Sequence, residues 1–143
     1  IGHNTDGDGL VRSLGALPET AVVLGNGGAA KAVSRALRQN GVEVVVCARH
    51  PAQGERPWSE IGEAVKDCGL LINATCLGMD KKDDFSDFSF LQMLPKSAIV
   101  YDLVYHPRQT KLLQEATKLC NPTIEGFSLL KSQAELAFTI FTA

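Results

Sequence analysis

The fold of this 143-residue chain is predicted from one stretch, T-A-V-V-L-G-N-G-G-A-A, at positions 20–30. Its first half, residues 20–25, is a short apolar run bounded by turn-forming residues, which is typical of a strand buried on both faces of a parallel sheet. Its second half, Gly25 to Ala30, matches the pattern G-x-G-x-x-A. Residues 29–40 follow with apolar side chains at helical spacing, and Asn40-Gly41 is a typical stop signal. The stretch therefore predicts a strand, a tight turn and a helix in succession.

Segments of the same two kinds alternate along the rest of the chain. Residues 42–48 are predicted as the second strand, which completes a βαβ unit with a right-handed crossover. Further strands are predicted at 70–74, 97–103 and 123–125, further helices at 5–17, 58–66, 110–119 and 127–141, and a charged irregular loop at 80–87. This alternation predicts one α/β domain over residues 1–143, with a Rossmann-like doubly wound, mainly parallel sheet and helices on both faces.

The composition narrows the kinds of partner to expect. The chain is 45% hydrophobic and 21% charged with a net charge of -2, so it carries no broad basic field for nucleic acid. No apolar run approaches the roughly 18 residues of a membrane span. The four cysteines are scattered without a C-x-x-C pair, which favours neither a metal site nor a disulfide framework. We therefore expect a small-molecule partner, no metal, no nucleic acid, no membrane and a cytoplasmic setting.

The glycine-rich turn has the residue types that a dinucleotide site needs. Gly25 allows a tight turn, Gly27 lets the backbone approach a pyrophosphate, and the small Ala30 permits close packing of helix on strand. The helix that follows directs its free N–H groups and positive dipole end at the phosphates. Glycine-rich turns also join strands and helices for purely structural reasons, so the inference depends on the βαβ context. The expected cofactor contacts in this turn are Gly25, Asn26, Gly27, Gly28 and Ala29.

The end of the second predicted strand bears on the choice between NAD and NADP. An NAD site usually has an acidic residue there, which hydrogen-bonds the ribose hydroxyls of the adenosine. This chain instead has Arg49, followed by His50. A guanidinium at this place forms a charge-assisted pair with a 2′-phosphate, so NADP is the expected cofactor. The alternative is a solvated arginine at a strand exit.

Several further motifs, taken in order, resemble one family. They are N-T-D-G from Asn4, the glycine turn, I-N-A-T from Ile72 with Gly78-Met79, D-L-V-Y-H-P from Asp102, and Glu125-Gly126-Phe127 through Gln133. In order and spacing they resemble the shikimate dehydrogenases over essentially the whole chain. The resemblance implies an NADP-dependent oxidoreductase that interconverts 3-dehydroshikimate and shikimate in aromatic amino acid biosynthesis.

The resemblance also implies roles for individual residues. Asp6 takes the place of an aspartate that pairs with a lysine of an N-terminal domain at the reacting hydroxyl, where oxidation of an alcohol needs a proton acceptor. The alternative for Asp6, by residue type alone, is a plain helix N-cap. The other implied substrate contacts are Asn4, Tyr105 and Gln133, and the other implied cofactor contacts are Asn73, Ala74, Thr75, Leu103 and Gly126. Each of these also has an ordinary interpretation as a turn, core or surface residue.

Two departures from the family pattern bear on function. The family often has a second basic residue shortly after the strand-end arginine, where this chain has Gln53, so the 2′-phosphate is expected to be held more weakly or with help from Arg56. The N-terminal domain that supplies the catalytic lysine and most substrate contacts has no counterpart here. We therefore expect the cofactor half of a shikimate dehydrogenase, inactive alone. The alternatives are a quinate- or NAD-using relative and a free-standing, non-catalytic NADP-binding module.

Overall fold

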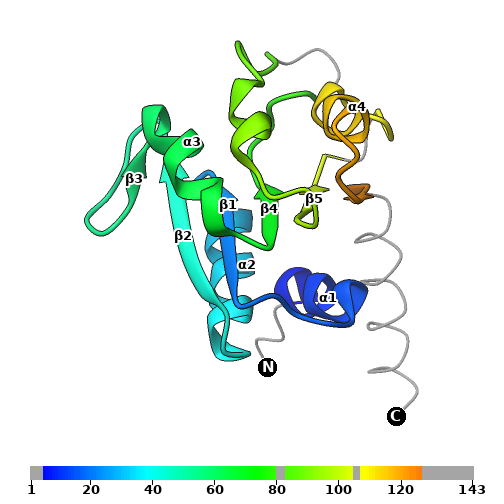
Figure 1. The fold of residues 1–143 in the computed structure, drawn as a ribbon. Coiled ribbons are helices and arrows are strands. Elements are labelled where there is room, and N and C mark those ends of the chain that lie inside the picture. The colour runs from blue at the N-terminus through cyan, green and yellow to red at the C-terminus, as the bar shows by residue number, and fades with distance from the viewer. Residues whose placement is uncertain (1–4, 80–82, 105–106, 127–143) are drawn as a thin grey trace.

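A computed structural model describes residues 5–79, 83–104 and 107–126, with side chains from residue 9 onward (Figure 1). Its centre is a six-stranded, all-parallel sheet in the order β3-β2-β1-β4-β5-β6. The strands are β1 (Thr20–Leu24), β2 (Glu43–Ala48), β3 (Arg56–Pro57), β4 (Leu70–Asn73), β5 (Ile99–Asp102) and β6 (Thr123–Ile124). This order is the doubly wound arrangement of dinucleotide-binding domains. The predicted fold class is confirmed.

Helices cover both faces of the sheet because β1 alternates its buried side chains between them. Ala21 and Val23 pack on one face against α1 (Thr5–Leu14) and α2 (Gly28–Gln39). Val22 and Leu24 pack on the other face against α3 (Ile61–Ala64), α4 (Lys111–Lys118) and the 3₁₀ turns η1 (Trp58–Glu60), η2 (Val65–Asp67) and η3 (Ser89–Met93). Figure 1 shows α2 lying along β1 and β2, with α4 over the opposite end of the sheet.

The structure differs from the predicted elements in three places. The predicted helix at 58–66 has only one α-helical turn, α3, between two 3₁₀ turns, since Gly62 lowers helix propensity at its centre. The edge strand β3 was not predicted; it has two residues, one of them a proline, which an edge position tolerates. Helix α1 ends at Leu14 rather than at residue 17 because Gly15 adopts a left-handed φ of 71°. The predicted helix at 127–141 lies outside the described residues.

The strand order brings three chain segments together at the carboxyl end of the sheet: the turn after β1, the end of β2 and the turn after β4. β1 continues into α2 on one face, whereas β4 continues into the layer of η3 and α4 on the other. Ligands of open α/β sheets bind at such a reversal of direction. Two backbone hydrogen bonds join the strand ends there, from Gly25 N to Cys47 O (2.8 Å) and from Ala74 N to Leu24 O (2.9 Å).

Candidate functional site

The glycine turn after β1 is tight at its first residue and open at the next two. Gly25 has a φ of 106°, and an added Cβ would lie 3.0 Å from Cγ2 of Thr75. A side chain at this position is therefore excluded by both conformation and space. Gly27 and Gly28 are exposed, and a Cβ on either would meet nothing within 4 Å. Above these two glycines there is room for a ligand to approach the backbone.

The N-terminus of α2 lies under this opening and has no cap from the protein. Gly27 is the N-cap residue with extended backbone, no side chain accepts a hydrogen bond from the first turn, and that turn has no acidic residue. The first N–H groups of a helix have no partner within the helix. In α2 the first N–H to find one is that of Lys31, which donates to Gly27 O at 3.0 Å. The N–H groups of Gly28, Ala29 and Ala30, together with the positive end of the helix dipole, are suited to bind a phosphate.

A cavity of about 350 Å³ lies between the glycine turn and the ends of β2 and β4. It brings together six of the predicted cofactor residues, Gly25, Asn26, Gly27, Arg49, Ala74 and Thr75. Five further residues that line it were not among the predicted cofactor contacts: Ala48, His50, Trp58, Cys76 and Leu77. Of these, only Ala48 and His50 had a signal in the sequence, as the neighbours of Arg49.

Arg49 lies at the rim of this cavity over an aromatic ring. Its guanidinium carbon is 5.7 Å from the ring centroid of Trp58, a cation–π arrangement. Trp58 in turn stacks on Phe85, with 5.8 Å between ring centroids. Arg49 is therefore exposed at the end of β2 and packs on Trp58, which in turn packs against the hydrophobic core.

Asn26 joins the glycine turn to the loop between β2 and β3. Its Nδ2 donates to the backbone oxygen of His50 (3.0 Å) and to Oε1 of Glu55 (2.9 Å). Glu55 also accepts a hydrogen bond from Ala52 N at 2.8 Å. The hydrogen bonds from Ala52 and then from Asn26 lower the pKa of the Glu55 carboxyl. These bonds hold the loop that carries Arg49 against the turn.

The predicted cofactor residue Asn73 occupies a different kind of environment. It is fully buried, and its Nδ2 donates to Leu77 O (3.1 Å) and to Oδ1 of Asp102 (3.0 Å). Its Oδ1 accepts from both N (3.0 Å) and Oγ1 (2.6 Å) of Thr75. All four of its hydrogen-bonding positions are thus used within the protein. Asn73 shapes the turn that presents Ala74 and Thr75 and does not itself line the cavity.

Asp102, at the end of β5, completes this network from a fully buried position. Its Oδ1 also accepts from Val104 N (3.0 Å), and its Oδ2 accepts from Oγ1 of Thr110 (2.7 Å), the N-cap of α4. Burial raises the pKa of Asp102 to about 6, with the hydrogen bonds from Thr110, Val104 and Asn73 acting in the opposite direction. Among the residues that the structure describes, the groups that donate hydrogen bonds to this carboxylate are all uncharged.

The remaining predicted site residues lie in different parts of the chain. Leu103 is half-buried directly after β5, and Gly126 packs so closely that a Cβ would lie 2.6 Å from Leu103 O. Asp6 is in the first turn of α1, where only the backbone is described. The predicted substrate residues Asn4, Tyr105 and Gln133 lie outside the described residues.

The described ranges contain neither a metal-binding cluster nor a membrane-spanning helix. No group of three or more His, Cys, Asp or Glu side chains is arranged to hold a metal ion among residues 9–79, 83–104 and 107–126. In those same ranges, no helix has the length and apolar character needed to cross a membrane.

No family model matches the chain, whereas individual relatives match nearly all of it. The shikimate dehydrogenase (NADP(+)) of Alkaliphilus oremlandii is 31% identical over 167 residues, which cover 99% of this chain and 58% of that protein. Further curated relatives, 32–36% identical to this chain, are also shikimate dehydrogenases. The resemblance predicted from the five motifs is therefore confirmed.

Solved structures give the same result for the fold. Shikimate 5-dehydrogenase from Thermus thermophilus, solved with NADP(H) and shikimate, superposes with a TM-score of 0.81 at 32% identity, covering 97% of this chain and 56% of that one. Quinate dehydrogenase from Corynebacterium glutamicum, solved with NAD, also has a TM-score of 0.81, at 28% identity over 99% of this chain and 57% of that one. The chain spans a little over half the length of the shikimate dehydrogenases that it matches.

Proposed function

We propose that this chain binds NADP and forms the cofactor-binding part of an enzyme that interconverts 3-dehydroshikimate and shikimate. The observation that carries the proposal is the uncapped N-terminus of α2 beneath the open backbone of Gly27 and Gly28. A pyrophosphate is the kind of group that such a site holds. Arg49, exposed at the rim of the same cavity, adds the charge that a 2′-phosphate requires.

In the proposed site, the segments that follow different strands contact different parts of the cofactor. When bound, a nicotinamide dinucleotide supplies hydride transfer to or from the reacting carbon. The backbone of Gly25 to Ala29 holds the pyrophosphate, and Ala74 and Thr75 border the ribose, in the turn that Asn73 braces. Leu103 and Gly126 are proposed to adjoin the nicotinamide.

The substrate side of the site is assigned from the family motifs. Asp6 is proposed to accept the proton of the alcohol, and Asn4, Tyr105 and Gln133 to contact the substrate. Because the chain spans only part of its relatives' length, the lysine that pairs with Asp6 and most substrate contacts are proposed to come from a further domain. A cytoplasmic location is also proposed, since all four cysteines are free.

Titration with dinucleotides tests the proposal directly. Trp58 is the single tryptophan and lines the cavity, so its fluorescence reports binding. We expect both NADP and NAD to bind and NADP to bind more tightly, with no oxidation of shikimate by this chain alone, because orientation of the alcohol supplies much of the rate. If neither dinucleotide binds, the proposal fails. Turnover by residues 1–143 would instead reject the assignment of substrate contacts to a further domain.

A second candidate is a quinate dehydrogenase that uses NAD. It is favoured by the structural similarity to the Corynebacterium enzyme and by the carboxylate of Glu55, which is hydrogen-bonded to the glycine turn. An acidic group near the adenosine favours ribose hydroxyls over a 2′-phosphate. NAD affinity equal to or above that of NADP, with quinate as the preferred alcohol after the further domain is added, would select this candidate.

A further inference from the structure

The carboxylate of Glu125, directly after β6, is bound by two side chains of the segment that precedes α4. Its Oε1 accepts a hydrogen bond from Nε of Arg108 (3.1 Å) and a second one, within an ion pair, from Nη2 of the same guanidinium. Its Oε2 accepts from Nε2 of Gln109 at 3.1 Å. Both carboxylate oxygens are therefore held by side chains 16 and 17 residues earlier in the chain. These three residues form the Glu125 cluster.

The Glu125 cluster is charged and only partly sheltered from water. The side chain of Glu125 is 21% exposed and that of Arg108 is 61% exposed. The hydrogen bond from Arg108 lowers the pKa of the Glu125 carboxyl, against the effect of burial, and the bond from Gln109 adds to this lowering. Glu125 is therefore ionised at neutral pH. Since such an exposed ion pair contributes little to overall stability, its effect is expected to be local, on the path of the chain after β6.

The residue that follows Glu125 packs closely against the chain after β5. The pairing of β6 with β5 ends at Ile124. Two residues later Gly126 is buried, and an added Cβ would lie 2.6 Å from Leu103 O and 2.8 Å from Val104 O. Only glycine permits two backbones to come this close. The path of the chain through Glu125 therefore decides how Gly126 meets Leu103.

The partners of Glu125 are themselves anchored to the buried network at the end of β5. Arg108 and Gln109 directly precede Thr110, whose Oγ1 donates to Oδ2 of Asp102 at 2.7 Å. Asp102 is in turn the residue before Leu103. The Glu125 cluster thus connects Gly126, through side-chain hydrogen bonds, to the same buried carboxylate that fixes the start of the Leu103 segment.

We propose that Glu125 is a positioning residue, which acts through Arg108 and Gln109 to hold Gly126 beside Leu103 and so shapes the place of the nicotinamide ring. This inference rests on the proposed function, in which Leu103 and Gly126 adjoin the nicotinamide. Glu125 acts through the backbone of its neighbour and does not itself touch the cofactor.

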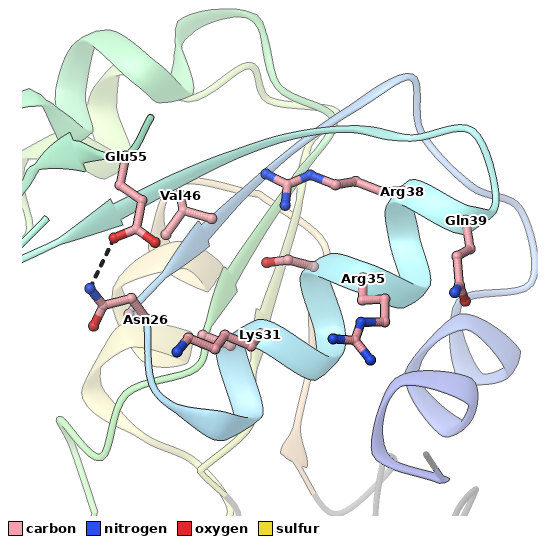
Figure 2. A pocket seen from close by; sticks show the side chains of 10 residues that line it. Asn26, Lys31, Arg35, Arg38, Gln39, Val46 and Glu55 are labelled. Carbon is pink, nitrogen blue, oxygen red and sulfur yellow. Dashed lines mark hydrogen bonds between the residues drawn. The ribbon is translucent and has the colours of Figure 1, made fainter. Parts of the chain in front are cut away.

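A second carboxylate has the corresponding place at the other end of the proposed site. Figure 2 shows Glu55 hydrogen-bonded to Asn26 of the glycine turn, where the adenosine end of the dinucleotide is proposed to lie. Glu55 and Glu125 each join two segments that are distant in the sequence, by 29 residues in one case and by 16 and 17 in the other. Substitution of each should consequently affect a different end of the cofactor.

Calorimetric titration with NADPH and with ADP-ribose 2′-phosphate, which lacks the nicotinamide, tests the assignment. The reduced nicotinamide is uncharged, so the charge of Glu125 does not attract it directly. Glu125→Ala is expected to weaken NADPH about fivefold and to leave ADP-ribose 2′-phosphate unchanged. Arg108→Ala should give a loss of the same kind, and the double variant should lose no more than the larger single loss, because both remove one interaction.

Two further variants separate this effect from changes elsewhere. Glu55→Gln should change the affinities of both ligands by the same factor, because both carry the adenosine end. Lys118→Ala is the matched control, since it removes another ion pair of the same stretch of chain, with Glu115 at 2.8 Å, and should alter neither affinity. A thermal melt of each variant checks that the fold is retained.

The outcomes distinguish this inference from the proposed function. Equal weakening of both ligands by Glu125→Ala, or no change in either, would overturn the positioning role. A parent chain that binds both ligands with equal affinity would also overturn it, because the nicotinamide would then gain nothing from Leu103 and Gly126, while binding of the dinucleotide would stand. If the parent chain binds neither ligand, the proposed function fails and this inference fails with it.

Discussion

Two turns lie side by side at the carboxyl end of the sheet and differ in how their polar groups are used. The glycine turn after β1 has open space over Gly27 and Gly28 and an uncapped helix end beneath them. The turn after β4 is closed, since Asn73 uses all its hydrogen-bonding positions on Thr75, Leu77 and Asp102. The open turn is therefore suited to bind a ligand, and the closed turn to hold its neighbours in place.

The difference follows from the energetic cost of unpaired polar groups. A buried polar group without a partner costs about 1–3 kcal/mol, so a turn in the interior must satisfy its own groups. Exposed N–H groups bond to water at little cost and are free to exchange that water for phosphate oxygens. Substitutions at Gly27 or Gly28 in the open turn should consequently change binding, and substitution of the buried Asn73 in the closed turn should change stability.

The largest effect is expected from Gly27→Val in the open turn. Gly27 has a φ of -78° and free space around its Cβ position, so valine is compatible with the fold. Its branched side chain would occupy the space into which the pyrophosphate must come, and both NADP and NAD should weaken by about a thousandfold or more. Fluorescence titration measures the loss, and a thermal melt checks that the fold is retained. Gly62→Ala in α3 is the matched control and should bind normally.

Asn73→Leu in the closed turn should have the opposite profile. Leucine has nearly the same shape but leaves polar groups of Thr75, Leu77 and Asp102 without their partner. Several unpaired groups at about 1–3 kcal/mol each lead us to expect a loss of about 4 kcal/mol in the free energy of unfolding, measured by urea denaturation. A loss under about 1 kcal/mol would show that the turn relaxes, and that its closure is not a source of stability.

The comparison also shows which parts of the molecule the sequence was able to predict. The glycine turn is local, with strand, glycines and helix in one stretch of eleven residues, and its geometry follows from residue type. The parallel sheet follows from alternating apolar segments in the same way. The boundaries of helices and strands follow less directly from residue type, as at Gly15, where a single residue in a left-handed conformation ends α1.

What sequence reasoning missed depends on contacts between distant segments. Asn73 and Asp102 are 29 residues apart, as are Asn26 and Glu55, and no local pattern pairs them. The same holds for Trp58, whose ring lies under Arg49 only because β2 and η1 meet at the sheet edge. Asn73 was predicted as a ligand contact from the family motif, whereas its burial and its hydrogen bonds to Thr75 indicate that it supports the turn after β4.

The buried carboxylate of the closed turn should make stability depend on pH. The pKa of Asp102 is raised to about 6 in the folded chain, against about 3.9 when unfolded. Between these values the folded state binds more protons, so the free energy of unfolding should fall as pH rises from about 4 to about 6, by about 3 kcal/mol in total, and then level off for this group. Asp102→Asn should remove the fall, whereas Asp87→Asn, at an exposed position, should leave it in place. Stability that rises steadily over this range in both the parent and Asp102→Asn would contradict the assignment.

The smallest effect is expected at the rim of the open turn, where Arg49→Ala should weaken NADP and leave NAD nearly unchanged. Arg49 is exposed, packs on Trp58, and has no role in the buried network, so Arg49→Ala should leave the fold intact. A charge-assisted pair contributes about 1.5–3 kcal/mol, and NADP affinity should therefore fall about tenfold or more. NAD lacks the 2′-phosphate and should bind as before, except for a change common to both cofactors if Trp58 moves when the guanidinium is removed.

Arg49→Lys distinguishes these contributions, because lysine keeps the charge but loses the planar fork that pairs with phosphate through two hydrogen bonds. Calorimetry on the three proteins should give an NADP affinity in the order arginine, lysine, alanine, with NAD nearly constant across them. Equal losses for both cofactors would mean that Arg49 acts only through its packing on Trp58, and that the 2′-phosphate is held elsewhere on the turn.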